Sequence, residues 1–272
     1  MKLIVLSNEN LDLKLIKEVY YNLLMPAFPN KDHIEPFDDF VEAFSERDIF
    51  EYKKKVFILI EEEEEEIVVA TLTVEYFPLS NFINMPYLVV KENYRGKKLS
   101  KILFEEGFKE LELQSKKRLE LLNNNPKDNR IIELTKFLNL NSTKETWELL
   151  KQFQPHYCLE SEYETEFDPI MNPLDRLKVY DKIGFKILNF NYVQPPLTKF
   201  KKSVSNLYLL TSTKFCLKDE NDEFYMKVES LKTFYWEFSH LISPLDFLNS
   251  NQFHQVIESI PNEKVYLKMV KF

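Results

Sequence analysis

Glycine is scarce in this chain, with 3 glycines in 272 residues. Glycine adopts left-handed backbone conformations without strain, so each glycine that is present marks a position with a backbone requirement. Gly96 lies between an apolar segment and an amphipathic one, Gly107 lies within a helical pattern, and Gly184 follows a second helical pattern. These three positions are therefore the first candidates for tight turns and close packing.

Cysteine and long apolar runs are also lacking. With Cys158 and Cys216 as the only cysteines, a disulfide framework and a cysteine-based metal cluster are excluded. No stretch approaches about 20 apolar residues, and the apolar run at the N-terminus is too short for a signal peptide. The composition, 44% hydrophobic and 14% aromatic, is sufficient for a substantial core. We expect a cytoplasmic protein with no membrane association and no metal.

The charge balance is acidic, with a formal net charge of −8. This argues against a nucleic-acid-binding surface and favours a neutral or cationic partner. Six adjacent carboxylates, Glu61 to Glu66, repel one another, so we expect them in water at a hairpin tip. Binding of a metal or a cationic ligand is the alternative reading of that run.

Periodicity and capping residues predict alternating strands and helices in the first half of the chain. The predicted elements are a strand over 2–7, a helix from Asn8 or Asn10 to Leu24 that ends before Pro26, a helix over 36–44, a hairpin of 56–60 and 67–76, a strand over 83–90, a helix over 97–117 and a short strand over 118–122. Together they indicate a mixed sheet covered by helices.

The second half is predicted to contain an insertion and an extension. A main domain over 1–211 carries a helical insertion at about 126–172, and residues 212–272 form an extension packed on the same domain. The predicted elements are helices near 131–138 and 144–153, an acidic segment over 160–168, a helix that starts at Asn172 and stops at Gly184, strands over 186–193 and 206–211, helices over 224–242 and 244–260, and a strand over 265–270.

One stretch combines a buried strand, a basic turn and an amphipathic helix. The strand is Tyr87 to Val90, the turn is Tyr94 to Lys98, and the helix follows. A helix N-terminus is electropositive and binds phosphate groups where the backbone can come close, which Gly96 permits. The stretch therefore suggests a phosphate site, and an ordinary strand-to-helix connection is the alternative.

Two motifs resemble those of the GNAT superfamily of N-acyltransferases. Tyr94-Arg95-Gly96-Lys97-Lys98-Leu99-Ser100 is similar to its motif A, R/Q-x-x-G-x-G/A. Tyr180-Asp181-Lys182-Ile183-Gly184-Phe185 is similar to its motif B, Y-x-x-x-G-F. Lys98 stands where the first motif prefers glycine, and Ser100 where it prefers glycine or alanine. The resemblance implies an α/β (α+β) fold with a GNAT-like, mixed, mostly antiparallel central sheet flanked by helices.

The resemblance also implies a function: transfer of an acetyl group from acetyl-CoA to an amine of a small molecule or peptide, by direct attack. The backbone of Leu88, Val89 and Val90 would hold the pantetheine arm, and the N–H of Val90 would face the thioester carbonyl. The pyrophosphate would be bound by the backbone of a six-residue turn, namely Arg95, Gly96, Lys97, Lys98, Leu99 and Ser100.

Tyr180 matches the motif B tyrosine, which implies the role of general acid. A phenol has a reference pKa of about 10, above the value of about 8.5 for a thiol, so it stays protonated and can donate to a thiolate. The alternative reading of Tyr180 is a core aromatic on an amphipathic helix, with Gly184 as an ordinary helix C-cap. The general base is left open among Glu75, His33, Glu35 and a route through water.

Two further hypotheses compete with an enzyme. The first is a non-catalytic module of the same fold that binds acyl-CoA or a protein partner. The second is an interaction protein that forms a homodimer through its aromatic-rich C-terminal segment. The sequence identifies neither the acceptor amine nor the length of the acyl chain.

Overall fold

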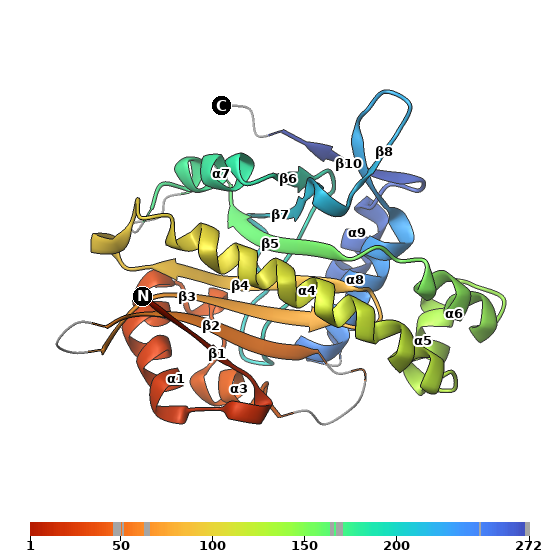
Figure 1. Ribbon diagram of the computed structural model, residues 1–272. Helices are drawn as coiled ribbons and strands as arrows, with labels where there is room; N and C mark the ends of the chain where they lie inside the picture. Colours follow the sequence, from red (N-terminus) through yellow and green to blue (C-terminus); the bar gives the residue numbers. More distant parts are fainter. Residues whose placement is uncertain are drawn as a thin grey trace.

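A single ten-stranded sheet forms the centre of the computed structural model, which describes residues 1–45, 50, 52–62, 66–163, 166, 171–244 and 246–269 (Figure 1). From edge to edge the sheet contains β1 (Lys2–Leu6), β2 (Lys53–Glu62), β3 (Glu66–Phe77), β4 (Phe82–Val90), β5 (His156–Glu162), β7 (Leu207–Ser212), β6 (Phe185–Leu188), β10 (Lys264–Lys268), β9 (Phe224–Lys227) and β8 (Leu217–Lys218). β4 and β5 run parallel, and the other neighbouring pairs are antiparallel. This confirms the predicted mixed, mostly antiparallel GNAT-like sheet.

Helices cover both faces of the sheet (Figure 1). They are α1 (Leu13–Val19), a π turn over 20–24, α2 (Met25–Ala27), α3 (Phe37–Glu42), α4 (Leu99–Asn124), α5 (Asn129–Phe137), α6 (Thr143–Lys151), α7 (Pro173–Lys182), α8 (Val228–Ile242) and α9 (Asn251–Ser259). β4 shows how its alternating side chains join the two layers. Tyr87 and Val89 pack with α1 and α3, whereas Leu88 and Val90 pack with α4 and α7. Within the ranges described above, no helix is long and apolar enough to cross a membrane.

The structure confirms most of the predicted elements within a few residues. The hairpin is formed by β2 and β3, the strand over 83–90 is β4, and the two helices of the insertion are α5 and α6. The side chain of Asn172 accepts a hydrogen bond from the N–H of Leu174 at 2.9 Å and so caps α7 as predicted. Parts of the acidic runs over 61–66 and 160–168 fall outside the described residues, as does Val270 of the last predicted strand.

The predicted strand over 118–122 is wrong, because α4 continues through it to Asn124. Arg118 is buried, and its guanidinium donates to the backbone carbonyls of Pro78 at 2.5 Å and of Leu79 and Leu150 at 2.7 and 2.8 Å. Arg118 therefore lies on the buried face of α4, where the sequence was misread as the end of the helix.

The N-terminal helix also differs from its prediction. Asn8 and Asn10 form a short 3-10 turn, and α1 is capped by Asp12, which accepts hydrogen bonds from the N–H groups of the next turn at 2.9 and 3.1 Å. Pro26 and Pro29 were predicted to end the helix. Pro26 lies at the beginning of α2, where proline is tolerated, and the helical path ends at Ala27, before Pro29. Ile16 and Val19 of α1 are buried in the core beside the sheet.

Four boundaries of the second half need correction. β5 is a strand inside the predicted helical insertion, and β6 ends at Leu188 instead of continuing to 193. β9 occupies 224–227, where the helix was predicted to begin, and α9 begins at Asn251 instead of Pro244. The chain leaves the sheet after β6, and this departure shapes the site described below.

The C-terminal residues contribute to the central sheet and to its core. β10 pairs with β6 through Leu267 and Leu188. Glu237 of α8 is buried and accepts hydrogen bonds from the N–H groups of Leu79 and Ser80, both at 2.8 Å, and from the Ser80 hydroxyl at 2.6 Å. The turn between β3 and β4 is therefore held by α8.

Candidate functional site

The site begins where β4 and β5 separate. The two strands pair only over Phe82–Asn84 and His156–Cys158. Beyond this point they diverge, and residues from the open part of each strand line one cavity. Parallel strands that separate leave backbone N–H and C=O groups without a neighbouring strand, so these groups are available to a ligand.

An irregularity in β4 marks the point of separation. The register with β3 shifts between Thr73 and Glu75, where β4 contains an extra residue. Pro86 lies in this stretch and has no N–H to donate, which fits a β-bulge. Lys91 N–H donates to the β3 carbonyl of Val69 at 2.9 Å. Since backbone groups alternate along a strand, those of Val90 and Leu88 face the open side.

The turn between β4 and α4 has the backbone geometry that the sequence suggested. Gly96 has φ +78° and Lys98 has φ +62°, so both are left-handed. A Cβ placed on Gly96 would find no heavy atom within 4 Å, which leaves open space above the turn. Residues 95–98 are exposed, and the first N–H groups of α4 have no acceptor within the helix. This arrangement is a suitable cradle for a diphosphate.

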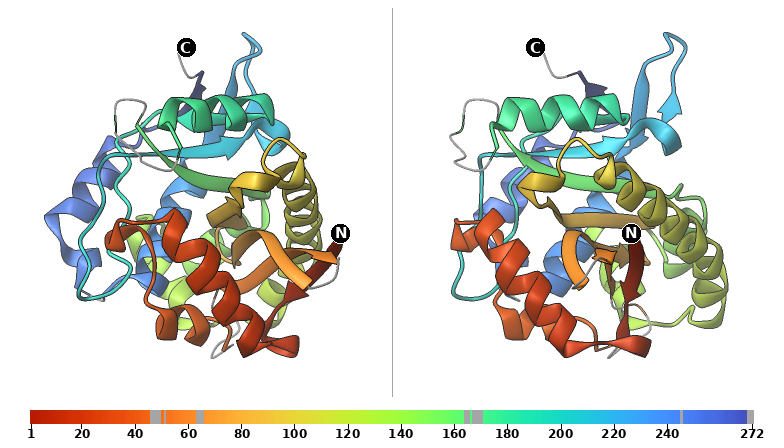
Figure 2. Two further views of the ribbon diagram at one scale, coloured as in Figure 1. Left: turned by 90° about the vertical axis from the view of Figure 1, so that its left-hand side faces the viewer. Right: turned by 60° about the vertical axis from the view of Figure 1, so that its left-hand side comes forward.

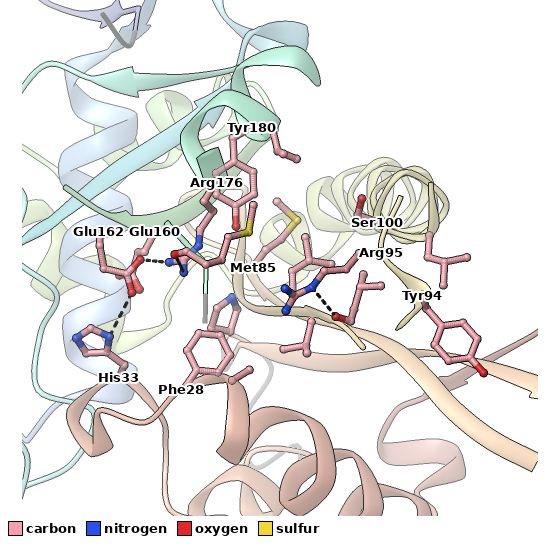
Figure 3. Close-up of a pocket in the computed structure, with 18 of the residues that line it drawn as sticks. Phe28, His33, Met85, Tyr94, Arg95, Ser100, Glu160, Glu162, Arg176 and Tyr180 are labelled. Carbon is pink, nitrogen blue, oxygen red and sulfur yellow. Dashed lines mark hydrogen bonds and ion pairs between the residues drawn. The ribbon is translucent and has the colours of Figure 1, made fainter. Parts of the chain in front are cut away.

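A cavity of about 350 Å³ extends from this turn between the two strands (Figure 3). Its lining includes all but one of the predicted cofactor-binding residues, namely Leu88, Val89, Val90, Arg95, Gly96, Lys98, Leu99 and Ser100. Lys97 is the exception, and its ammonium lies 4.5 Å from the centre of the Tyr94 ring. The Arg95 side chain donates from Nε to the Val90 carbonyl at 3.4 Å.

Tyr180 reaches the same cavity from α7. Its hydroxyl points into the space between the strands, beside Met85 of β4 (Figure 3). The side chain is 8% exposed, and burial raises the pKa of the phenol, with Arg176 opposing this shift. The phenol therefore stays protonated at neutral pH, and the predicted candidate acid lies next to the predicted cofactor segment.

Glu160 of β5 is a titratable group in the cavity that the sequence reasoning missed. Its carboxylate accepts hydrogen bonds from the Tyr192 hydroxyl and, at 2.5 Å, from Gln194 Nε2. Burial raises the pKa of Glu160 to about 7, although these two hydrogen bonds lower it. A carboxyl with a pKa near neutrality, in a cavity that also holds a protonated phenol, is suited to accept a proton.

Glu162, two residues further along β5, is paired with His33 and Arg176. One of its oxygens lies 3.7 Å from His33 Nδ1, and the other accepts from the Arg176 guanidinium. Burial opposes the charge of Glu162, but His33 and Arg176 outweigh it and hold its pKa below the usual range. Glu162 is therefore paired, whereas Glu160 forms no ion pair among the residues described, although His33 also lowers its pKa.

The predicted candidates for the general base separate into two locations. His33 lines the cavity. Glu35 and Glu75 do not line it, and they form a buried ion cluster with Lys54, whose ammonium lies 2.8 Å from Glu35 and 3.3 Å from Glu75. Burial raises the pKa of Glu75 to about 7, with Lys54 opposing this effect. This cluster joins β2 and β3 to the segment after α2.

Comparison with known protein families gives one match within the chain. The family model described as the acetyltransferase (GNAT) family matches residues 17–135. The match spans less than half of the chain, and it makes residues 17–135 similar to this family of acetyltransferases. The matched segment includes β4, the turn at 95–98 and α4, and it ends before Glu160 and Tyr180. No curated protein sequence matches the chain.

Several solved structures are similar at low identity. One is a protein from Bacteroides thetaiotaomicron assigned to the GNAT acetyltransferases, with 15% identity and a TM-score of 0.49, covering 89% of this chain and 97% of that one. Another is the ribosomal-protein-S18-alanine N-acetyltransferase from Escherichia coli, with 12% identity, a TM-score of 0.40 and coverages of 81% and 98%. A third is the PaiA N-acetyltransferase from Thermoplasma acidophilum, solved with coenzyme A, with 12% identity, a TM-score of 0.38 and coverages of 78% and 99%.

Proposed function

We propose that this protein is an acetyl-CoA-dependent N-acetyltransferase that acetylates an amine of a small molecule or peptide. The observation that carries the proposal is the meeting of three features in one cavity: the open edge of β4, the left-handed turn at 95–98, and a Glu160–Tyr180 pair. The family match over residues 17–135 supports acetyl transfer, and the site residues named here are proposed.

The chain offers a complementary group to each part of acetyl-CoA. The backbone N–H groups around Gly96 and the start of α4 take the pyrophosphate, aided by the charges of Arg95 and Lys98. The backbone groups of Leu88, which face the open side of β4, pair with the amides of the pantetheine arm, as an added strand would. The thioester then lies between Val90, whose N–H faces its carbonyl oxygen, and Tyr180.

Glu160 and Tyr180 divide the proton transfers. The acceptor arrives as an ammonium, Glu160 removes one proton, and the nitrogen lone pair attacks the thioester carbon. The Val90 N–H stabilises the developing oxyanion. As the C–S bond breaks, Tyr180 donates its proton to the thiolate and regains one from the acylated nitrogen through the cavity. The products are an amide, the free thiol of coenzyme A and one proton released through Glu160.

The acceptor side of the cavity favours an amine with an apolar body and a single positive charge. Its walls include Ala27, Phe28, Met85 and Leu207, and Glu160 is the carboxylate left for a cation once Glu162 is paired. The predicted cytoplasmic location, the absence of nucleic-acid partners and the homodimer stay predictions.

The function is tested by incubating the purified protein with acetyl-CoA and a panel of small amines and N-terminal peptides, with release of the free thiol as the readout. Tyr180→Phe is expected to lower kcat by about 100-fold or more, since general acids contribute that much, while acetyl-CoA binding is kept. Binding without turnover across the panel would instead favour the non-catalytic module.

A further inference from the structure

The segment between β6 and β7, residues 189–206, leaves the sheet and returns to it, and we call it the strap. It is closed on itself by two backbone hydrogen bonds between Gln194 and Val204, at 2.8 and 3.1 Å. Its far end reaches the turn after α2, where the Lys201 ammonium donates to the Lys31 carbonyl and the Lys202 N–H donates to Asp32 at 3.3 Å. Figure 2 shows this segment descending beside the N-terminal helices.

The strap supplies both side-chain hydrogen-bond donors to the Glu160 carboxylate, and only one of them, Gln194, lines the cavity. Tyr192 donates through its hydroxyl and is buried at 3% exposure. Gln194 donates through Nε2 at 2.5 Å, lines the cavity and is 5% exposed. A carboxylate only accepts, so the amide nitrogen of Gln194 must face Glu160, and its oxygen must point elsewhere.

That oxygen, Gln194 Oε1, is buried and has no hydrogen-bond partner among the described residues. A buried carbonyl oxygen without a partner is costly, and it is stabilised when a donor arrives. Because Oε1 and Nε2 belong to one planar amide, the free oxygen lies within a few ångström of the Glu160 carboxylate. An ammonium placed against Glu160 therefore brings a donor close to it.

Resting on the proposed transfer reaction, we propose that Gln194 is the specificity-determining residue that selects primary over secondary amines, because its Oε1 accepts the one N–H that the acceptor nitrogen keeps. A primary ammonium has three N–H bonds. One proton goes to Glu160, one ends on the sulfur through Tyr180, and the third remains in the amide product. That third N–H faces Gln194 throughout. A secondary ammonium has two N–H bonds and loses both, so Oε1 stays unpaired.

Gln194 also positions Glu160 and affects its protonation. The carboxyl is surrounded by titratable groups from five elements, namely Tyr87 of β4, Cys158 and Glu162 of β5, His33 before α3, Tyr192 of the strap and Tyr235 of α8. Loss of a donor hydrogen bond to the carboxylate raises the pKa of Glu160 further. Tyr192 and Gln194 share this role, whereas only Gln194 has the free oxygen, so the two residues form a matched pair.

The test compares Gln194→Met with Tyr192→Phe in the full-length protein. Two amine pairs are used with acetyl-CoA: 2-phenylethylamine with its N-methyl derivative, and glycinamide with sarcosinamide. The wild type is expected to prefer each primary amine by about 100-fold or more in kcat/KM, since a site built to pair an N–H rejects the analogue without it. Gln194→Met is expected to reduce this ratio by about tenfold, the value of one buried hydrogen bond.

Tyr192→Phe is expected to keep the ratio, and both variants are expected to move the acidic limb of the kcat/KM profile to higher pH. The ratio compares two substrates in one preparation, so partial unfolding of a variant cancels. Equal wild-type rates for the two amines of each pair, or an unchanged ratio in Gln194→Met, would overturn the inference while leaving acetyl transfer intact. Transfer to none of the four amines would overturn both.

Discussion

Replacement of Glu160 by glutamine is expected to abolish acetyl transfer and yet to stabilise the protein at alkaline pH. In Glu160→Gln the side chain keeps its size, its oxygen can accept from Tyr192, and the Gln194 amide can turn over to meet the new NH₂ group. The variant therefore loses the proton acceptor without losing its hydrogen bonds. Its side chain is neutral at every pH, so folding no longer requires a buried carboxylate charge at alkaline pH.

The size and sign of the stability effect follow from the pKa of Glu160. Burial raises that pKa from its usual 4.5 to about 7. A carboxyl whose pKa is higher in the folded than in the unfolded protein favours folding below the unfolded value, and this contribution is lost as pH rises through the folded value. Each pKa unit corresponds to about 1.4 kcal/mol, so the wild type loses about 3 kcal/mol between pH ~4.5 and pH ~8 that the variant keeps.

Urea denaturation at pH 5, 6, 7 and 8 measures this difference, and the thiol-release assay measures activity on the same preparations. Glu162→Gln is the matched control on β5, because its pKa is held low by His33 and Arg176. That control is expected to be less stable than the wild type above pH ~4.5, the opposite sign. A Glu160→Gln variant that is less stable than the wild type at pH 8, or that retains activity, would refute the assignment of Glu160.

Two further predictions concern stability elsewhere. Lys98→Gly removes the strain of a lysine in the left-handed conformation, so urea denaturation is expected to show a free energy of unfolding higher by up to about 1 kcal/mol. The neighbouring Lys97→Gly is expected to lower it by up to about 1 kcal/mol. A loss in both variants would contradict the strain argument. Glu237→Gln replaces one of the two acceptor oxygens that hold the Leu79–Ser80 turn, and it is expected to lower the free energy of unfolding by about 1–3 kcal/mol. Glu229→Gln, at an exposed position on the same helix, is expected to change it by no more than about 0.5 kcal/mol. Equal values for the two variants would show that the buried hydrogen bonds contribute little.

The glycines explain why the turn at 95–98 and the close packing of α4 could be predicted from the sequence. Gly96 and Gly184 both have a positive φ, of +78° and +90°, so in this glycine-poor chain these glycines do mark turns that need a left-handed backbone. A side chain at Gly107 would collide with the Tyr157 hydroxyl, which confirms close packing of α4 on the sheet. These requirements are local, since they depend on a turn or on one helix face, and local patterns are readable in a single sequence.

Glu160 was not predictable in the same way. Its strand, β5, follows two helices of the insertion, and its place beside β4 depends on pairing over about 70 positions of sequence. The local signal was the apolar run at 157–159 before Glu160, which indicates a strand but not its neighbour. The link to Tyr192 and Gln194 depends on the path of the strap after β6, which no periodicity specifies.

Isothermal titration calorimetry with acetyl-CoA tests the central claim, that the open edge of β4 and the turn at 95–98 hold this co-substrate. The wild type is expected to bind one equivalent, and Gly96→Ala is expected to bind at least about tenfold more weakly, because a side chain there strains the turn and obstructs the diphosphate. Absence of binding heat in the wild type, or equal affinity in the two proteins, would contradict the account.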